Sequence, residues 1–196
     1  MKKGLKTIII IAIIAVVIYL WFKSGYNAMV EKQETVQAQW AQVENVYQRR
    51  ADLIPNLVAT VKGYAAHEEG TLTAVIEARA KATGVTIDPT NITPEQLEQF
   101  QAAQDQLSGA LSRLLVSVEA YPELKANENF LALQSQLEGT ENRITVERQK
   151  FNDTAKDYNQ YIRKFPRNII ASIFDFEKVG YFKAQAGAET APKVEF

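Results

Sequence analysis

The sequence has no cysteine, which excludes disulfides, thiolate metal sites and a lipid-modified N-terminal cysteine. Histidine is nearly as scarce: His67 is the only one in 196 residues, so a metal centre built from several histidines is excluded. We interpret His67 as a polar residue at a helix end. No glycine-rich phosphate loop and no G-x-S-x-G nucleophile motif occur. These absences predict no cofactor and no enzymatic activity.

Acidic residues are missing from the start of the chain. Residues 1–23 carry four lysines and no acid. Residues 24–196 hold 18 basic and 23 acidic side chains, a net charge of −5, whereas the whole chain has −1. Non-specific nucleic-acid binding depends on neutralising phosphates, so a nucleic acid is not an expected partner.

The first long hydrophobic run predicts a membrane anchor over residues 1–25. The run "TIIIIAIIAVVIYLWF" has sixteen uncharged residues and as a helix spans roughly 24 Å, close to the ~30 Å hydrocarbon core. Lys6 and Lys23 can reach the headgroups from either end, and Trp21 lies where interfacial aromatic residues concentrate. A cleaved signal peptide is the alternative. The length of the run and the lack of an A-x-A-like cleavage site favour an uncleaved anchor.

Long helices are predicted for the rest of the chain, because apolar residues recur at alternating steps of four and three. Arg50 alone interrupts the first series, and similar series begin at Leu97 and Phe130. No stretch alternates with the period of two that a half-buried strand shows. The sequence therefore predicts an all-α fold: after the transmembrane helix, residues 26–166 form an antiparallel up-down four-helix bundle with long coiled-coil-like helices.

Two helix starts carry capping signals. Thr93 is followed by Pro94 and Gln96, which is the pattern of a capping box with proline in the first turn. Asn127 can cap the last long helix after a tight reversal. The Gln-rich stretch "QLEQFQAAQDQ" is expected to place polar side chains on outer helix faces.

Two residues are expected to interrupt the first long helix. Pro55 has no N–H to donate to the carbonyl of Ala51, so a kink is expected there. Gly70 is expected to separate a helix of residues 26–68 from a shorter one of residues 71–83.

Several motifs resemble the LemA family of bacterial membrane proteins. They are "YNAMV" after the anchor, "QRRADLIPNLVATVKGYAAHE", "YPELKAN", "TENRI…FN…YN" and the closing "FP…FDFEKVGYF". The resemblance runs from the anchor to about residue 182. It implies a single-pass envelope protein with an antiparallel four-helix bundle. One branch of this family is associated with magnetosome membrane formation.

The "RRADLIPNLV" stretch allows two interpretations. Arg49, Arg50 and Asp52 could form an anion-binding or catalytic site. Alternatively, Arg50 is a polar residue of the helix seam. Counting residues from the base of the first helix puts Arg50 level with Glu141 on the last helix, so a pair is expected there. We favour a structural polar layer of Arg50, Glu141 and Glu147, in which a shifted register would leave a buried charge alone.

The aromatic segment of residues 167–183 is expected at the foot of the bundle, beside the membrane. Ile173, Phe174 and Phe176 can lie in the membrane interface. The other reading is that the segment covers the open end of the bundle core, and the sequence leaves both open. The Ala-rich tail, residues 184–196, is predicted to be disordered.

These observations favour a non-enzymatic, membrane-anchored scaffold of the bacterial envelope that self-associates and contacts other envelope membrane proteins or shapes the membrane. The alternatives are a receptor whose bundle binds a small ligand or peptide, and an undetected hydrolase. The lysine distribution favours a cytoplasmic N-terminus, with the bundle outside the cytoplasm. The expected location is the inner membrane, and the expected partners are the lipid bilayer and further copies of the chain.

Overall fold

The computed structural model describes residues 3–65 and 68–184. Helices take up 83% of these residues, and none of them forms a strand. The all-α prediction is therefore confirmed. His67 and nearly all of the tail predicted to be disordered lie outside the described residues.

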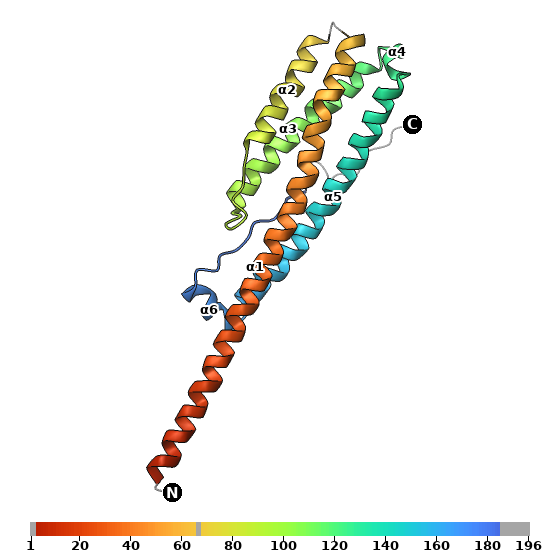
Figure 1. Cartoon of the computed structure of the whole chain (residues 1–196). Helices are drawn as coiled ribbons and strands as arrows, with labels where there is room; N and C mark the ends of the chain where they lie inside the picture. The colour runs from red at the N-terminus through yellow and green to blue at the C-terminus, as the bar shows by residue number, and fades with distance from the viewer. Residues whose placement is uncertain (1–2, 66–67, 185–196) are drawn as a thin grey trace, which may run out of the picture.

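A single helix, α1, runs from Lys3 to Tyr64 (Figure 1). Its N-terminal part is exposed on all sides and is long and apolar enough to cross a membrane. No break separates this part from the part that packs against other helices, which begins near Phe22. The predicted boundary after residue 25 is thus not a change of secondary structure.

Pro55 lies inside α1, and the helix continues through it. The carbonyl oxygen of Ala51, which would otherwise accept from residue 55, accepts a hydrogen bond from Arg79 Nε at 2.8 Å. Ala51 is buried, so this bond supplies a partner where water is excluded. Arg79 belongs to the next helix, and the proline therefore creates a point of attachment between the two helices.

The second helix, α2, spans Glu69–Gly84 and pairs closely with α3, Pro94–Val118. The predicted break between these two helices is present, but it lies a few residues earlier than expected: α1 ends at Tyr64, and Gly70 lies in the first turn of α2. A glycine in a first helical turn carries little penalty, because the turn's N–H groups have no helical partner in any case.

The capping signals at the two later helix starts are confirmed. Thr93 Oγ1 accepts from the Gln96 N–H at 3.2 Å, while Gln96 Oε1 accepts from the Thr93 N–H at 3.3 Å. Asn127 Oδ1 accepts from the Phe130 N–H at 3.0 Å and starts α5, Glu128–Arg163. A short turn of helix, α4 at Pro122–Lys125, precedes it.

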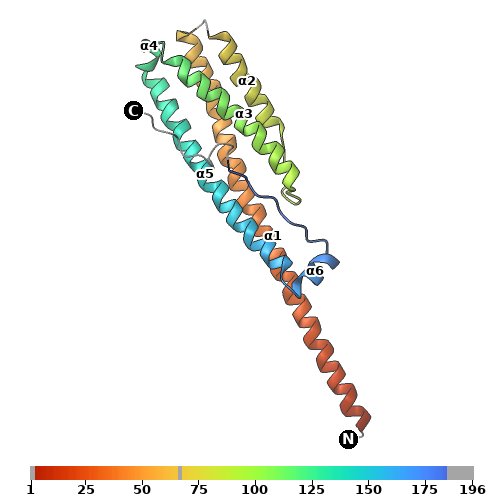
Figure 2. The same cartoon turned by 180° about the vertical axis from the view of Figure 1, so that it is seen from behind.

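Helices α1 and α5 share the most extensive contact. The ion pairs between them occur in opposite order along the two helices: Lys32 pairs with Asp157, whereas Arg50, further along α1, pairs with Glu141, which is earlier in α5. The α2–α3 pair lies beside the distal part of α1 and α5, away from the N-terminus, as both views show (Figures 1 and 2).

The core consists of two hydrophobic clusters stacked along the helices. The cluster nearer the apolar part of α1 includes Trp40, Phe100 and Phe151. The distal cluster includes Leu57 and Leu114. Arg50 lies between the two clusters along α1 and belongs to neither. A buried polar level at Arg50 therefore separates the two apolar clusters along the seam.

The chain after α5 has two parts. A short helix, α6 at Arg167–Ile173, packs against the base of α1 and α5. Asp175, with φ 55°, then turns the backbone, a left-handed conformation that Asp tolerates better than most residues. Residues 176–183, which we call the strap, run back along α5 away from the foot (Figure 2, blue).

Candidate functional site

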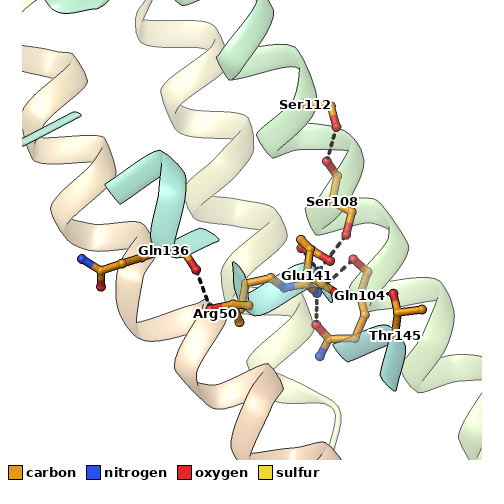
Figure 3. Close-up of polar contacts among 8 residues, drawn as sticks. Arg50, Gln104, Ser108, Ser112, Gln136, Glu141 and Thr145 are labelled. Atoms are coloured by element: carbon orange, nitrogen blue, oxygen red, sulfur yellow. Dashed lines mark hydrogen bonds and ion pairs between the residues drawn. The ribbon is translucent and has the colours of Figure 1, made fainter. Parts of the chain in front are cut away.

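The guanidinium of Arg50 is the centre of a buried polar cluster (Figure 3). Arg50 is 1% exposed. Its Nη1 donates to Glu141 Oε1 at 2.6 Å and to Ser108 Oγ at 2.7 Å. Its Nη2 donates to Gln104 Oε1 at 2.6 Å. The structure thus brings Arg50 and Glu141 together, as the helix lengths predict.

Gln104 extends this cluster to the remaining long helix. Its Nε2 donates to the carbonyl oxygen of Ala82 at 3.2 Å. The cluster therefore links α1 through Arg50, α3 through Gln104, α5 through Glu141 and α2 through Ala82. Gln101 and Gln104 are both buried. The prediction that the Gln-rich stretch faces solvent is wrong for Gln101, whereas Gln104 belongs to the four-three series that begins at Leu97. Glutamine is mostly exposed in proteins unless it is hydrogen-bonded, and here both side chains are.

The surroundings of Arg50 give it little chemical freedom. The guanidinium carbon of Arg50 lies 5.1 Å from the centre of the Tyr47 ring. Arg50 Nε has no hydrogen-bond partner among the described residues. Ser108 accepts from the guanidinium, which is permanently charged and cannot serve as a base to activate the hydroxyl. Arg49 and Asp52 do not join the cluster; Asp52 instead accepts from Gln48 on the helix surface. This geometry favours a structural role.

Glu147, the third residue of the predicted polar layer, lies away from Arg50. It accepts from Gln39 Nε2 at 2.8 Å and from Lys150 Nζ at 2.8 Å. The hydrogen bond from Lys150, and then that from Gln39, lower the pKa of the Glu147 carboxyl. Glu147 therefore makes a separate polar contact between α5 and α1.

A groove of about 380 Å³ opens beside the cluster between α3 and α5. Glu141 and Ser108 lie in its wall, together with Leu111 and Leu137. Glu141 is 44% exposed, so its carboxylate connects the buried arginine to solvent.

The residues predicted to lie in the membrane interface differ in their exposure and in the helix that carries them. Lys6, Trp21 and Lys23 project from the exposed part of α1. Ile173 and Phe174 are also exposed, at the foot. Phe176 is half-buried, with its ring 5.7 Å from Tyr26.

Part of the aromatic segment, residues 167–183, covers the bundle core, and part of it remains exposed at the foot. Ile170, Ala171 and Phe182 are buried in the core cluster, whereas Ile173 and Phe174 remain exposed. Only α6 and the turn after it lie at the foot. The expectation that the whole segment lies beside the membrane is therefore wrong for the strap, which leaves the foot along α5.

Three carboxamide side chains hold the strap by its backbone, an arrangement that the sequence did not reveal. Asn159 accepts from the Val179 N–H at 2.9 Å and donates to the Val179 carbonyl at 2.8 Å. Asn152 makes the same pair of bonds with Phe182, at 2.8 and 3.0 Å. Gln101 makes it with Lys183, at 3.0 Å for both bonds. The only sequence signal is that Asn152 and Asn159 stand seven residues apart and so share one face of α5.

Phe182 is the side chain that anchors the strap. Its ring stacks on Trp40 at 6.1 Å and meets Phe151 edge-on at 5.5 Å. Arg148 lies over its ring at 4.8 Å. Phe182 therefore belongs to the hydrophobic cluster nearer the apolar part of α1, which we call the lower cluster. The packed ring and the six carboxamide hydrogen bonds fix the position of the strap.

A sequence profile of the LemA family matches residues 39–196. Magnetosome protein MamQ of Magnetospirillum gryphiswaldense is 29% identical over 84% of this chain and 67% of its own length. Magnetosome protein MamQ 2 of Paramagnetospirillum magneticum is 27% identical over 95% of this chain and 74% of its own. Protein LemA of Metamycoplasma hominis is 24% identical over 86% of this chain and 73% of its own.

Proposed function

Because the chain belongs to the LemA family, we propose that it is a non-enzymatic, membrane-anchored helical scaffold of the bacterial envelope, which acts through protein–protein contacts and self-association. The names of the three relatives describe no enzymatic activity, and two of the three are magnetosome proteins. This protein would act at a membrane, as a scaffold or by shaping the bilayer. The proposed architecture is an antiparallel up-down four-helix bundle on a single transmembrane helix.

The observation that carries this proposal is the burial of the Arg50 guanidinium among side chains of α3 and α5. A receptor or a hydrolase would need polar groups that remain available for a ligand. Besides the Tyr47 ring, the partners of Arg50 are Gln104, Ser108 and Glu141. These three hydrogen bonds link α1 to α3 and α5. The cluster instead sets the register of α1 against α3 and α5, because any slip would leave a charge buried without partners.

The second support is the uninterrupted course of α1. The helix joins the apolar segment directly to the bundle, so the bundle stands at a fixed height above the bilayer in every copy. Copies with the same height present the same surfaces to one another, which favours lateral contacts between them. The proposed location is the inner membrane, with the bundle outside the cytoplasm.

Crosslinking of the intact protein in membranes tests this proposal. Because the chain has no cysteine, single cysteines at exposed α1 and α5 positions such as Glu44 and Arg143 give defined attachment points. We expect crosslinks between copies that persist when the membranes are diluted by fusion with excess lipid. Crosslinks that disappear in proportion to the dilution would show random collision, and the scaffold proposal would then be wrong.

A further inference from the structure

The foot of the bundle lies at the depth where the apolar run of α1 ends. Phe22, the last residue of that run, packs against the lower core cluster. A Cβ added to Gly25 would come within 2.7 Å of Ile170 Cδ1 in α6, so the two helices approach closely there. At the next residue of α1, the ring of Tyr26 meets that of Phe174 edge-on at 4.8 Å. If the apolar run spans a bilayer, α6 lies at its surface.

The foot exposes large apolar side chains at this depth. Phe165, at the corner between α5 and α6, is 82% exposed, and Ile173 is 57% exposed. Ile169 stands one turn before Ile173 on the same outer face of α6, and it is also exposed. The opposite face of α6 is apolar too, because Ile170 is fully buried. A helix that is apolar on both faces fits a position between a protein core and lipid.

The charge of the foot is opposite to that of the rest of the bundle. Its two segments, residues 23–30 and 158–174, contain Lys23, Arg163, Lys164 and Arg167 and no acid. The other residues from 24 to 196 hold 15 basic and 23 acidic side chains, a net charge of −8. Three acids adjoin these segments in sequence: Glu31, Asp157, which pairs with Lys32, and Asp175 in the turn after Phe174.

This division of charge selects the kind of surface that the foot can meet. An anionic surface attracts the foot and repels the remainder of the bundle, so both terms favour the same orientation. Arg167 lies over the ring of Tyr161 at 4.1 Å, and this contact holds its guanidinium beside the last turns of α5. A neutral surface would use the apolar side chains but not these cations.

An apolar groove of about 640 Å³ adjoins the foot. One wall is the α1 face that includes Ile18 and Phe22, and the other is Phe174. Lys23 is the single charged residue of its lining, and it lies at the end of the apolar run. The groove thus has the form expected for an acyl chain with an anionic headgroup at its mouth.

We propose that the foot is a binding site for anionic phospholipid. Lys23, Arg163, Lys164 and Arg167 bind the headgroup phosphates, and the groove beside Phe174 holds an acyl chain. This proposal rests on the membrane anchoring proposed above and adds the class of lipid. It is independent of self-association, which the crosslinking experiment measures separately.

Quenching by brominated lipid tests the proposal on the full-length protein. Ile173→Cys carries an environment-sensitive fluorophore, and the protein is reconstituted in phosphatidylcholine vesicles. Either a brominated phosphatidylglycerol or a brominated phosphatidylcholine is then added at the same fraction. We expect quenching severalfold stronger by phosphatidylglycerol, and a preference that weakens at high salt, because exposed charges are screened.

Two charge-removing variants separate the foot from general electrostatics. In the labelled protein, Arg163→Gln with Lys164→Gln should abolish most of the preference, because each cation near an anionic surface contributes substantially to attraction. The matched control, Arg113→Gln with Arg143→Gln, removes two exposed cations far from the foot and should leave the preference intact. Equal quenching by both lipids in the labelled protein that keeps all four foot cations would overturn the proposal. Absence of quenching by either would also overturn it and would assign the surface to a protein partner.

Discussion

At the scale of single residues, the Arg50–Glu141 pair is asymmetric. The guanidinium is buried, whereas the carboxylate reaches solvent along the α3–α5 groove. Removing the carboxylate leaves a buried positive charge without its counter-ion. Removing the guanidinium leaves a carboxylate that water can solvate. The two halves of the same ion pair therefore differ in what their loss costs.

We accordingly expect Glu141→Ala to lower the free energy of unfolding by about 3 kcal/mol. Arg50→Met, which fills the same space with an apolar chain, should cost clearly less. Urea denaturation of the two variants in detergent checks this order. An Arg50→Met variant as unstable as Glu141→Ala would show that the hydrogen bonds to Gln104 and Ser108 matter more than the charge.

Tyr158 gives the structure a dependence on alkaline pH. Burial, and after it the negative charge of Glu177, raise the pKa of Tyr158 to about 12; burial also raises the pKa of Tyr47. An unfolded tyrosine has a pKa of about 10. Above that pH the unfolded chain releases the phenol proton while the folded chain keeps it, so the free energy of unfolding falls as pH rises.

The contribution of Tyr158 is fully present below pH 10 and is lost between about pH 10 and pH 12, at up to about 1.4 kcal/mol per pH unit. Tyr158→Phe cannot ionise, so its unfolding midpoint should decline less over this range. The measurement is the urea midpoint at a series of pH values. Identical slopes for both proteins would contradict the assignment.

At the scale of elements, the bond between Arg79 and the Ala51 carbonyl depends on Pro55. In the natural chain, Arg79→Ala leaves a buried carbonyl without a donor, at a cost of about 1–3 kcal/mol. In a Pro55→Ala background, the N–H of the new residue can bond that carbonyl within the helix. A double-mutant cycle should therefore show a smaller effect of Arg79→Ala in that background. Additive effects would mean that the arginine stabilises the protein in another way.

The strap provides a second prediction at this scale. A Cβ on Gly180 would lie 2.9 Å from Pro94 Cα, in the rigid backbone at the start of α3. Gly180→Ala should therefore destabilise by about 1–3 kcal/mol and loosen the strap. Gly139, inside α5, has no atom near the corresponding position, so Gly139→Ala should stabilise by about 0.5–1 kcal/mol. Opposite signs in thermal unfolding are the expected result, and loss of stability in both would contradict it.

The elements differ in how far the sequence predicts them. The four-three spacing locates the long helices, and the level of Glu141 follows from counting because helices rise uniformly. The strap has no such period, since its partners are side-chain amides on distant helices. Gln101 and Asn159 look like surface residues in sequence, and only the returning backbone makes them buried. The predicted start of α2, at residue 71, is two residues later than the observed start at Glu69, because a glycine near a helix end indicates a break without fixing its position.

At the scale of the whole molecule, the side of the membrane on which the bundle lies is open to direct measurement. Glu44→Cys places one thiol on the exposed surface of α1, in a chain that has no other. With the bundle outside the cytoplasm, a membrane-impermeant maleimide should label this thiol in intact cells. Labelling only after the inner membrane is permeabilised would reverse the proposed topology.

The unbroken course of α1 makes the molecule a lever. Residues 23–64 of this helix extend about 63 Å beyond the apolar run. A change of about 10° in the angle of the membrane-crossing part therefore displaces the far end by about 11 Å. The angle of such a helix responds to bilayer thickness, so local thinning or thickening of the lipid would be amplified into movement at the tip near α4.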